Sequence, residues 1–343
     1  MLTDYCIWFR IKKRRYPHIN MLLVSTSSII ISYVMILLSI AFFTLLERKV
    51  LGYVQIRKGP NKVRIIGLPQ PLADAVKLFF KEQKKINKIN IISFYTAPII
   101  SLTLALLLWT IIPYTSALVI LTYSTLGFLC ISRLSVYIII AAGWGSNSNY
   151  ALIGALRAIA QTISYEVSMA LTLLFPLIIY LTLSLNKINR SNLIWPTMLL
   201  LPARYIWFAT ILAETNRTPF DHAEGESELV SGFNTEYIGG PFTLIFMAEY
   251  LSILAISAFR VILFSPSHRI IGVDQINITI KITIIATLFI WMRGTLPRIR
   301  YDQLINLTWK TYLPFIIVIL ILIIEYIYIN ENLPLISKNK YKQ

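Results

Sequence analysis

The sequence predicts an all-α integral membrane protein with eight transmembrane helices and an interfacial amphipathic helix in the first loop. Apolar residues make up 56% of the 343 residues and the mean hydropathy is +0.67, which is more apolar surface than one soluble core encloses. The apolar residues also gather into eight runs, each close to the roughly 20 residues that a membrane-spanning helix needs. These runs cover residues 21–46, 91–113, 117–142, 158–182, 193–213, 241–263, 276–292 and 312–329.

The basic residues predict how the chain is oriented. Residues 47–90 carry eleven Lys or Arg against three acids, so this first loop belongs on the matrix or cytoplasmic side. Eight crossings then place both termini on the opposite side. The basic run from Arg10 to Arg15 opposes this rule, so we expect it to belong to an extension without a catalytic role; the alternative is translation starting at Met21. The predicted parts are a basic N-terminal extension (1–20), a single polytopic membrane domain (21–329) and a polar C-terminal tail (330–343).

Cysteine and histidine spacing argues against a metal or cluster site built from this chain alone. Cys6 and Cys130 are far apart, the three histidines show no ligand spacing, and neither GxGxxG nor a P-loop occurs. We therefore expect no metal here and expect the redox centres on other chains. The net charge of +16 lies mainly in loops beside apolar runs, so it predicts membrane topology and lipid contact, not nucleic-acid binding.

Four cations fall within or at the ends of the apolar runs, where a charge costs roughly 2.5–3.5 kcal/mol unless it is paired or reaches the membrane surface. We expect Arg133 and Lys281 to face protein or a polar cavity. Arg260 is expected to reach the membrane surface along its apolar stem. For Arg204 both interpretations stay open.

The first loop contains a segment with helical periodicity. Leu72, Ala75, Val76 and Phe79 recur at i, i+3, i+4 and i+7, while Asp74, Lys77 and Lys81 form another stripe. This pattern predicts a helix that lies in the membrane surface. Such a helix either flanks an opening for a lipid-soluble substrate or is a plain interfacial anchor.

The fourth apolar run has polar residues on two faces. An α-helix turns by about 100° per residue, so the polar residues of this helix fall on two opposite faces, both at membrane depth. We therefore expect protein around this helix and regard Glu166 as a candidate for a proton relay; the alternative is a structural Glu paired with an intramembrane Arg or Lys. The stripe holds Arg157, Gln161, Ser164 and Ser168, and the opposite side holds Thr162 and Glu166.

Seven of the sixteen acids fall between residues 214 and 249. Thr218-Pro219-Phe220-Asp221 has the form of a helix start, which would put Asp221, Glu224 and Glu228 on one face. Clustered carboxylates repel one another and burial disfavours their charge, so some should hold protons near neutral pH and titrate as a group. The alternative is a solvated acidic loop. The seven are Glu214, Asp221, Glu224, Glu226, Glu228, Glu236 and Glu249.

Four segments together resemble the subunit 1 family of mitochondrial NADH:ubiquinone oxidoreductase, respiratory complex I, in its animal form. They occur in the expected order, and the resemblance covers residues 21–329. The segments are ERKVLGYVQIRKGPN (47–61), GSNSNYALIGALRAIAQTISYE (145–166), AETNRTPFDHAEGESELVSG (213–232) and GTLPRIRYDQL (294–304).

The resemblance implies a function at the junction of two arms. In that family the chain joins the peripheral redox arm to the proton-pumping membrane arm, and the first helix, surface helix and sixth helix frame a quinone tunnel. It implies ubiquinone as substrate, no cofactor on this chain alone, and NADH, FMN and iron–sulfur clusters on partner subunits of complex I. It also implies a multi-pass protein of the mitochondrial inner membrane.

Residue roles carry over by position from the same resemblance. Residues implied to line or border the quinone path are Arg48, Arg57, Asp74 and Phe246; those implied to couple quinone reduction to proton movement are Glu166, Glu214, Asp221, Glu224, Glu226, Glu228, Glu236 and Glu249. The chain departs from the family in starting before Met21, in having His222 at a usually apolar position, and in carrying charge at Arg133 and Arg204. His222 adds an ionisable ring to the acid set.

Two other classes of function stay open. A stand-alone cation or proton transporter would also need intramembrane carboxylates and a lysine near the midplane, although we find no inverted repeat. A passive structural anchor for a redox enzyme predicts that the buried acids are dispensable.

Overall fold

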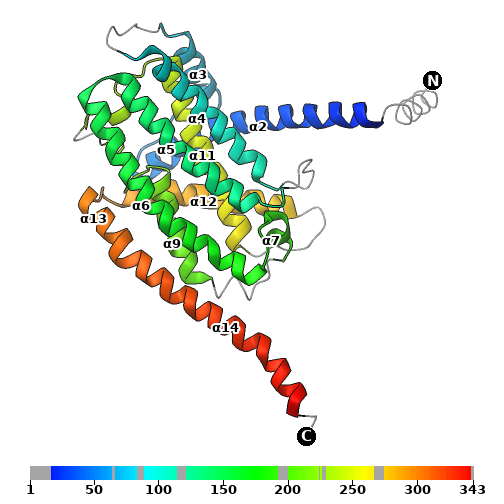
Figure 1. Cartoon of the computed structure of the whole chain (residues 1–343). Coiled ribbons are helices and arrows are strands. Elements are labelled where there is room, and N and C mark those ends of the chain that lie inside the picture. The colour runs from blue at the N-terminus through cyan, green and yellow to red at the C-terminus, as the bar shows by residue number, and fades with distance from the viewer. Residues whose placement is uncertain are drawn as a thin grey trace, which may run out of the picture.

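The computed structural model describes residues 17–63, 66–82, 89–113, 121–191, 200–223, 225, 229–265 and 274–340. These residues form helices and turns, with no β-strand among them, and seven stretches are long and apolar enough to cross a membrane, which confirms the all-α membrane class (Figure 1). The spanning elements are α2 (Pro17–Val54), α4 (Ile91–Ile111), α5 (Ser124–Ser146), α6 (Asn149–Tyr180), α11 (Gly240–Phe264), α12 (Asp274–Thr295) and a final rod made of α13 (Tyr301–Asn306), the π-helical turn η2 (Leu307–Tyr312) and α14 (Leu313–Lys340).

Shorter helices complete the described chain: α3 (Gln70–Phe80), α7 (Leu185–Ser191), α9 (Leu201–Glu214) and η1 (Gly232–Asn234). Helix α9 is the described part of the expected run 193–213, and residues 192–199 lie outside the described residues. The count of eight crossings therefore stays a prediction. Of the predicted extension 1–20, residues 1–16 lie outside the described residues and 17–20 form the start of α2; α14 runs as a helix to Lys340.

Hydrogen bonds between helix ends define two sides of the bundle. Asn90 N donates to Gly145 O (2.9 Å), so α4 begins beside the end of α5 and close to the first loop. Thr125 N donates to Leu183 O (3.3 Å), so α5 begins beside the end of α6 and near α7. We call these the loop-1 side and the opposite side. Helix α11 starts on the loop-1 side and ends on the opposite side (Figure 1).

Helix α11 is the centre of the core. From Leu251 to Phe264 nearly every residue is buried, as expected of a helix that is apolar all round. Phe259 stacks on Phe128 of α5 with ring centroids 4.0 Å apart, and α11 contacts α2, α3, α4, α7, α9 and α12. Its packing holds together elements that are distant in sequence.

Helix α2 extends beyond the predicted apolar run 21–46. The loop was expected to begin at Glu47, but the helix continues to Val54. Beyond the helix the chain turns back at Ile56 (φ 56°). A Cβ at Gly52 would come within 2.9 Å of Gly59 N, so this close crossing of two backbones requires glycine.

The amphipathic helix in the first loop is confirmed as α3. Its apolar stripe points outward, since Leu72, Val76 and Phe79 are each about half exposed, while α3 contacts both α2 and α11. An outward apolar stripe is the arrangement that a helix in a membrane surface requires. Its position relative to the lipid stays a prediction.

The helix start expected at Thr218 is wrong. The described residues from Thr218 to Ala223 form turns, with a cis Thr218–Pro219 bond. Backbone groups that a helix would use are bonded elsewhere: Ile299 N donates to Pro219 O (3.1 Å) and the Gln161 side chain donates to Phe220 O (2.8 Å). Tertiary contacts thus replace the local helical pattern.

Candidate functional site

A cavity of about 120 Å³ lies between α4, α5 and α11 and is lined by residues from the middle part of each of these helices. Most of its wall is apolar, so burying a polar side chain there costs free energy unless that side chain is hydrogen-bonded. Glu214, Thr215 and Asn216 line it from the end of α9, Glu249 and Ser252 from α11, and Ser101, Ser132 and Ser135 from α4 and α5.

Two predicted acids meet in this cavity. Glu214 is the last residue of α9 and Glu249 lies in the third turn of α11, yet both side chains form the same wall. Glu214 Oε2 is buried without a hydrogen-bond partner among the described residues. Two carboxyls in one largely apolar cavity cannot both be ionised at low cost, so the cavity favours shared or partial protonation.

Glu166 of α6 belongs to the same group. Its charge acts on Glu214, and its Oε1 is buried without a partner among the described residues. Its Oε2 lies 3.6 Å from Arg133 Nε of α5. The expected alternative, pairing with an intramembrane cation, is therefore seen as a contact, but the long distance leaves most of the carboxyl's hydrogen-bonding capacity unused.

The buried amide of Gln161 positions the acidic segment against α6. Gln161 has no exposed surface, and its Nε2 donates to Ala213 O (2.9 Å) and Phe220 O (2.8 Å). This one side chain therefore binds both ends of the segment 213–220. The chain does not surround α6, however, because Leu156 and Ile163 form an exposed stripe.

The other predicted acids are divided between separate places. Asp221 Oδ2 lies 3.3 Å from Arg298 Nη2, away from the cavity wall. The ring of His222 is buried edge-on against Tyr301, with centroids 5.8 Å apart. Glu236 is half-buried after η1 and does not line the cavity. Glu224, Glu226 and Glu228 lie outside the described residues.

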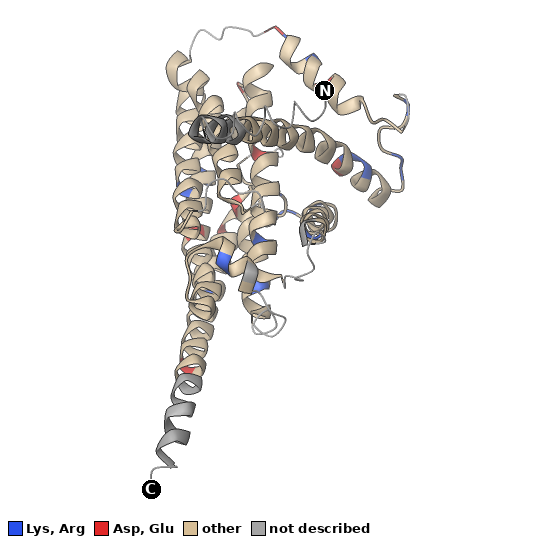
Figure 2. Cartoon of the chain, turned by 90° about the vertical axis from the view of Figure 1, so that its right-hand side faces the viewer, with Lys and Arg blue, Asp and Glu red and all other residues tan. Residues whose placement is uncertain are grey.

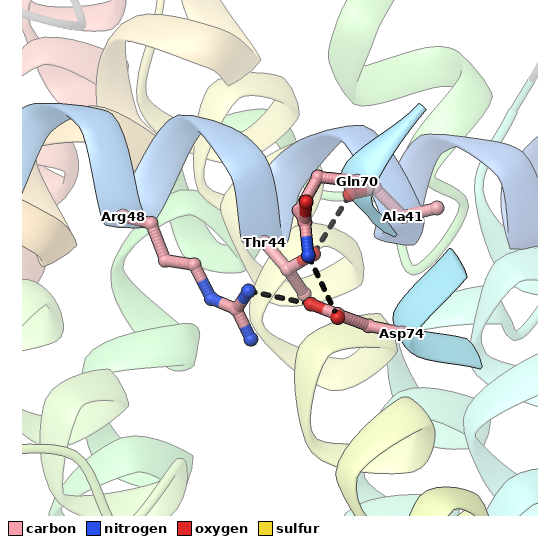
Figure 3. Close-up of polar contacts among 5 residues, drawn as sticks. All are labelled: Ala41, Thr44, Arg48, Gln70 and Asp74. Atoms are coloured by element: carbon pink, nitrogen blue, oxygen red, sulfur yellow. Dashed lines mark hydrogen bonds and ion pairs between the residues drawn. The ribbon is translucent and has the colours of Figure 1, made fainter. Parts of the chain in front are cut away.

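Of the residues implied to border a quinone path, the structure joins two. Arg48 Nη1 of α2 donates to Asp74 Oδ2 of α3 (2.6 Å), and Gln70 Nε2 donates to Asp74 Oδ1 (3.0 Å) (Figure 3). The third, Arg57, is exposed in the turn after α2 and donates to Gln55 (2.8 Å). The fourth, Phe246, lies on another helix, α11.

Phe246 is half-buried on α11 and packs on Phe242, with centroids 4.4 Å apart. It is on the stretch of α11 that precedes Glu249. The structure therefore places three of the implied quinone-path residues on α2, α3 and α11, elements in mutual contact, and Arg57 in the turn after α2; of the four, Arg48 and Asp74 form an ion pair.

Sequence reasoning missed a buried ionic cluster around Glu47. This carboxyl is 7% exposed; it accepts hydrogen bonds from Tyr250 Oη and Arg293 Nη1 and lies 3.7 Å from Arg217 Nη1. The Arg217 guanidinium lies 4.6 Å from the centre of the Tyr250 ring. Burial would lower the pKa of Arg217, but Tyr250, Glu249 and Glu47 together raise it above its ordinary value, so Arg217 is held as a cation.

The Glu47 cluster ties α2, the segment after α9, α11 and α12 together on the loop-1 side. In the sequence, Glu47 looks like one acid in a basic loop, and nothing in its neighbours marks it as buried. Figure 2 shows that acidic positions occur inside the bundle as well as on its loops. Among the described residues, no group of three or more His, Cys, Asp or Glu side chains is arranged to hold a metal ion.

The four intramembrane cations differ in environment. Arg133 contacts Glu166 but its side chain is 63% exposed, and Lys281 is half-buried on α12. Arg260 is 9% exposed, and its guanidinium carbon lies 4.4 Å from the centre of the Phe208 ring; that it reaches the membrane surface stays a prediction. Arg204 is half-buried near the start of α9.

Comparison with known proteins agrees with the resemblance seen in the sequence. The NADH dehydrogenase family profile matches residues 27–324. The chain is 54% identical over 282 residues to NADH-ubiquinone oxidoreductase chain 1 of Aedes aegypti, covering 81% of this chain and 88% of that protein. It is 49% identical over 310 residues to the protein of that name in Heterololigo bleekeri, covering 90% and 99%.

A third relative, NADH-ubiquinone oxidoreductase chain 1 of Branchiostoma lanceolatum, is 47% identical over 317 residues, with 92% of this chain and 97% of that protein covered. The similarity extends through α2, the cavity and the final rod. This chain therefore belongs to the NADH dehydrogenase family.

Proposed function

We propose that this chain frames the entry of ubiquinone into NADH:ubiquinone oxidoreductase and couples quinone reduction to proton movement through its buried carboxyls. Family membership makes it a membrane subunit of that enzyme and a multi-pass protein of the mitochondrial inner membrane. In this proposal ubiquinone is the substrate, and NADH, FMN and iron–sulfur clusters are bound by partner subunits of the two arms. Lipids surround the exposed apolar faces.

The quinone part of the proposal is supported by the corner that α2, α3 and α11 form. The outward apolar stripe of α3 suits contact with a lipid-soluble molecule. Directly beside it, the Arg48–Asp74–Gln70 contact fixes a guanidinium that can donate to a quinone carbonyl oxygen or stabilise its reduced, anionic form. Arg57 lies in the turn after α2, and Phe246 lies on α11.

The proton part of the proposal is carried by one observation: Glu214 and Glu249 line a shared cavity within range of Glu166. The cavity has room for several water molecules, and four serine hydroxyls on its wall can pass or accept hydrogen bonds. Unpartnered carboxyl oxygens on Glu166 and Glu214 provide places for protons to rest.

The Glu47 cluster supplies a physical connection between the two parts. Glu47 precedes Arg48 in sequence, and its partner Tyr250 follows Glu249. Arg217 interacts electrostatically with both Glu47 and Glu249. A change of charge at the quinone corner would therefore alter the electrostatic field at the cavity through Glu47 and Arg217.

The test is proton pumping by the assembled complex in sealed vesicles. Glu166→Gln and Glu214→Gln remove titration but keep a polar side chain, and each should lower the number of protons moved per electron. Glu325→Gln, in the exposed part of α14, is the matched control. If Glu166→Gln, Glu214→Gln and their double variant all pump at the parental ratio and rate, the carboxyls are structural and the chain is an anchor.

A further inference from the structure

Two arginines meet where α9 begins and α11 ends, on the opposite side of the bundle from the quinone corner. Arg204 Nη2 donates to Phe264 O, the last carbonyl of α11. Arg260, one turn earlier on α11, is 9% exposed and lies over Phe208 of α9. The two guanidinium groups are close enough for their charges to interact.

The charges of this arginine pair are not balanced by the helix ends. A helix C-terminus carries roughly half a negative charge, so the end of α11 offsets about a quarter of the pair's charge of about +2. The start of α9 adds roughly half a positive charge at the same place.

Arg260 also has hydrogen-bonding capacity that the protein does not use. Its Nη1 is buried without a partner among the described residues, and the Phe208 ring accepts only a cation–π contact. A buried guanidinium nitrogen of this kind is stabilised best by an anion that accepts charge-assisted hydrogen bonds. Among the described residues, no acidic side chain forms an ion pair with Arg260.

The position of the pair near the end of α11 suits a phospholipid headgroup. Arg260 lies four residues from the end of α11, or about 6 Å at about 1.5 Å per residue. The polar zone on each face of a bilayer is roughly 5–7 Å thick. Tyr205, which follows Arg204, is 71% exposed, as is typical of aromatic residues at this level of the membrane.

We propose that Arg204 and Arg260 form a binding site for a phosphate group, with Arg204 as the outer donor and Arg260 as the inner one, and that an anionic phospholipid supplies it. Membrane proteins bind lipid phosphates in basic pockets between helices, and guanidinium groups match phosphate geometry well. This site is separate from the quinone corner and from the carboxyl cavity.

The first test measures lipid retention by the assembled complex. After delipidation, the complex is incubated with vesicles of phosphatidylcholine containing phosphatidylglycerol, re-isolated, and its bound lipids are quantified by mass spectrometry. Arg260→Gln and the double variant Arg204→Gln/Arg260→Gln should bind phosphatidylglycerol at least about tenfold more weakly, the factor for one lost charge-assisted hydrogen bond. Binding of phosphatidylcholine should not change.

Two controls separate this site from general surface charge. Lys187→Gln removes an exposed cation from α7 on the same side of the membrane and should leave lipid retention unchanged. Arg204→Lys/Arg260→Lys keeps both charges and should retain part of the binding. Equal phosphatidylglycerol retention by the parental complex and the double glutamine variant would overturn the proposal, since an acid elsewhere in the chain would then neutralise the pair.

A second measurement needs no variant that must assemble. Phosphatidylglycerol with a photoreactive headgroup should label the parental complex at the start of α9 or the end of α11, and labelling confined to other parts of the chain would overturn the proposal. Excess inorganic phosphate distinguishes the source: if it leaves the labelling intact, the lipid is the ligand. If it abolishes labelling at the arginine pair, the site binds free phosphate and the assignment to a lipid is wrong.

Discussion

The contact between Arg48 and Asp74 predicts that these two residues act on quinone as one unit. The guanidinium of α2 and the carboxylate of α3 are 2.6 Å apart, and Gln70 holds the second carboxylate oxygen at 3.0 Å. Replacing either Arg48 or Asp74 with alanine therefore removes the same fixed arrangement. A double-mutant cycle measures how far the two effects overlap.

The expected size follows from the exposure of the pair. The side chains of Arg48 and Asp74 are 55% and 33% exposed, so solvent screens the attraction, and such pairs contribute about 0.2–1 kcal/mol. The hydrogen bond from Gln70 raises the coupling toward about 1 kcal/mol. Because 1.4 kcal/mol corresponds to a factor of ten, each single variant should lower kcat/KM for ubiquinone by about fivefold.

The assay is steady-state quinone reduction by the assembled complex, with electron transfer from NADH to a water-soluble acceptor measured in parallel. Electron transfer from NADH to the water-soluble acceptor should be unchanged, because the early redox centres are expected on other subunits. Lys77→Ala, an exposed cation on α3, is the matched control and should have little effect on either activity. Loss of both activities together would indicate failed assembly.

The double variant decides whether the reasoning is right. If Arg48 and Asp74 act as one unit, the kcat/KM of the double variant for ubiquinone should be only slightly below that of either single variant. If the two losses multiply to about 25-fold, the residues act independently. The ion pair would then be incidental to quinone binding.

Three further predictions concern other parts of the chain. Glu47→Gln removes the carboxylate that forms an ion pair with the buried Arg217, and breaking a buried pair costs about 3–5 kcal/mol in comparable cases. The temperature of half-inactivation of the complex should fall, whereas exposed Glu82→Gln should not lower it. Glu226→Gln should reduce protons pumped per electron, and an unchanged ratio would remove Glu226 from the coupled group. A chain without residues 1–20 should assemble and turn over normally; loss of turnover in a correctly assembled complex would contradict this.

The class of protein and most of its helices could be determined from the sequence alone. A run of about 20 apolar residues has few alternatives in a membrane, because every backbone amide must be bonded within the segment. The 3.6-residue period likewise predicted α3. The resemblance carried by 47–61 and the other segments predicted the family, which the comparisons confirm.

Only the tertiary structure decided which charged groups meet. Glu214 and Glu249 are 35 positions apart in the sequence, and their common cavity depends on how α9 and α11 pack. The expected helix at Thr218 failed because Gln161 and the 298–300 segment take its backbone groups. Glu47 appeared to be a loop residue, yet partners from three distant segments surround it. Local patterns report helix formation, whereas burial and ionic contacts depend on long-range packing that no short stretch of sequence encodes.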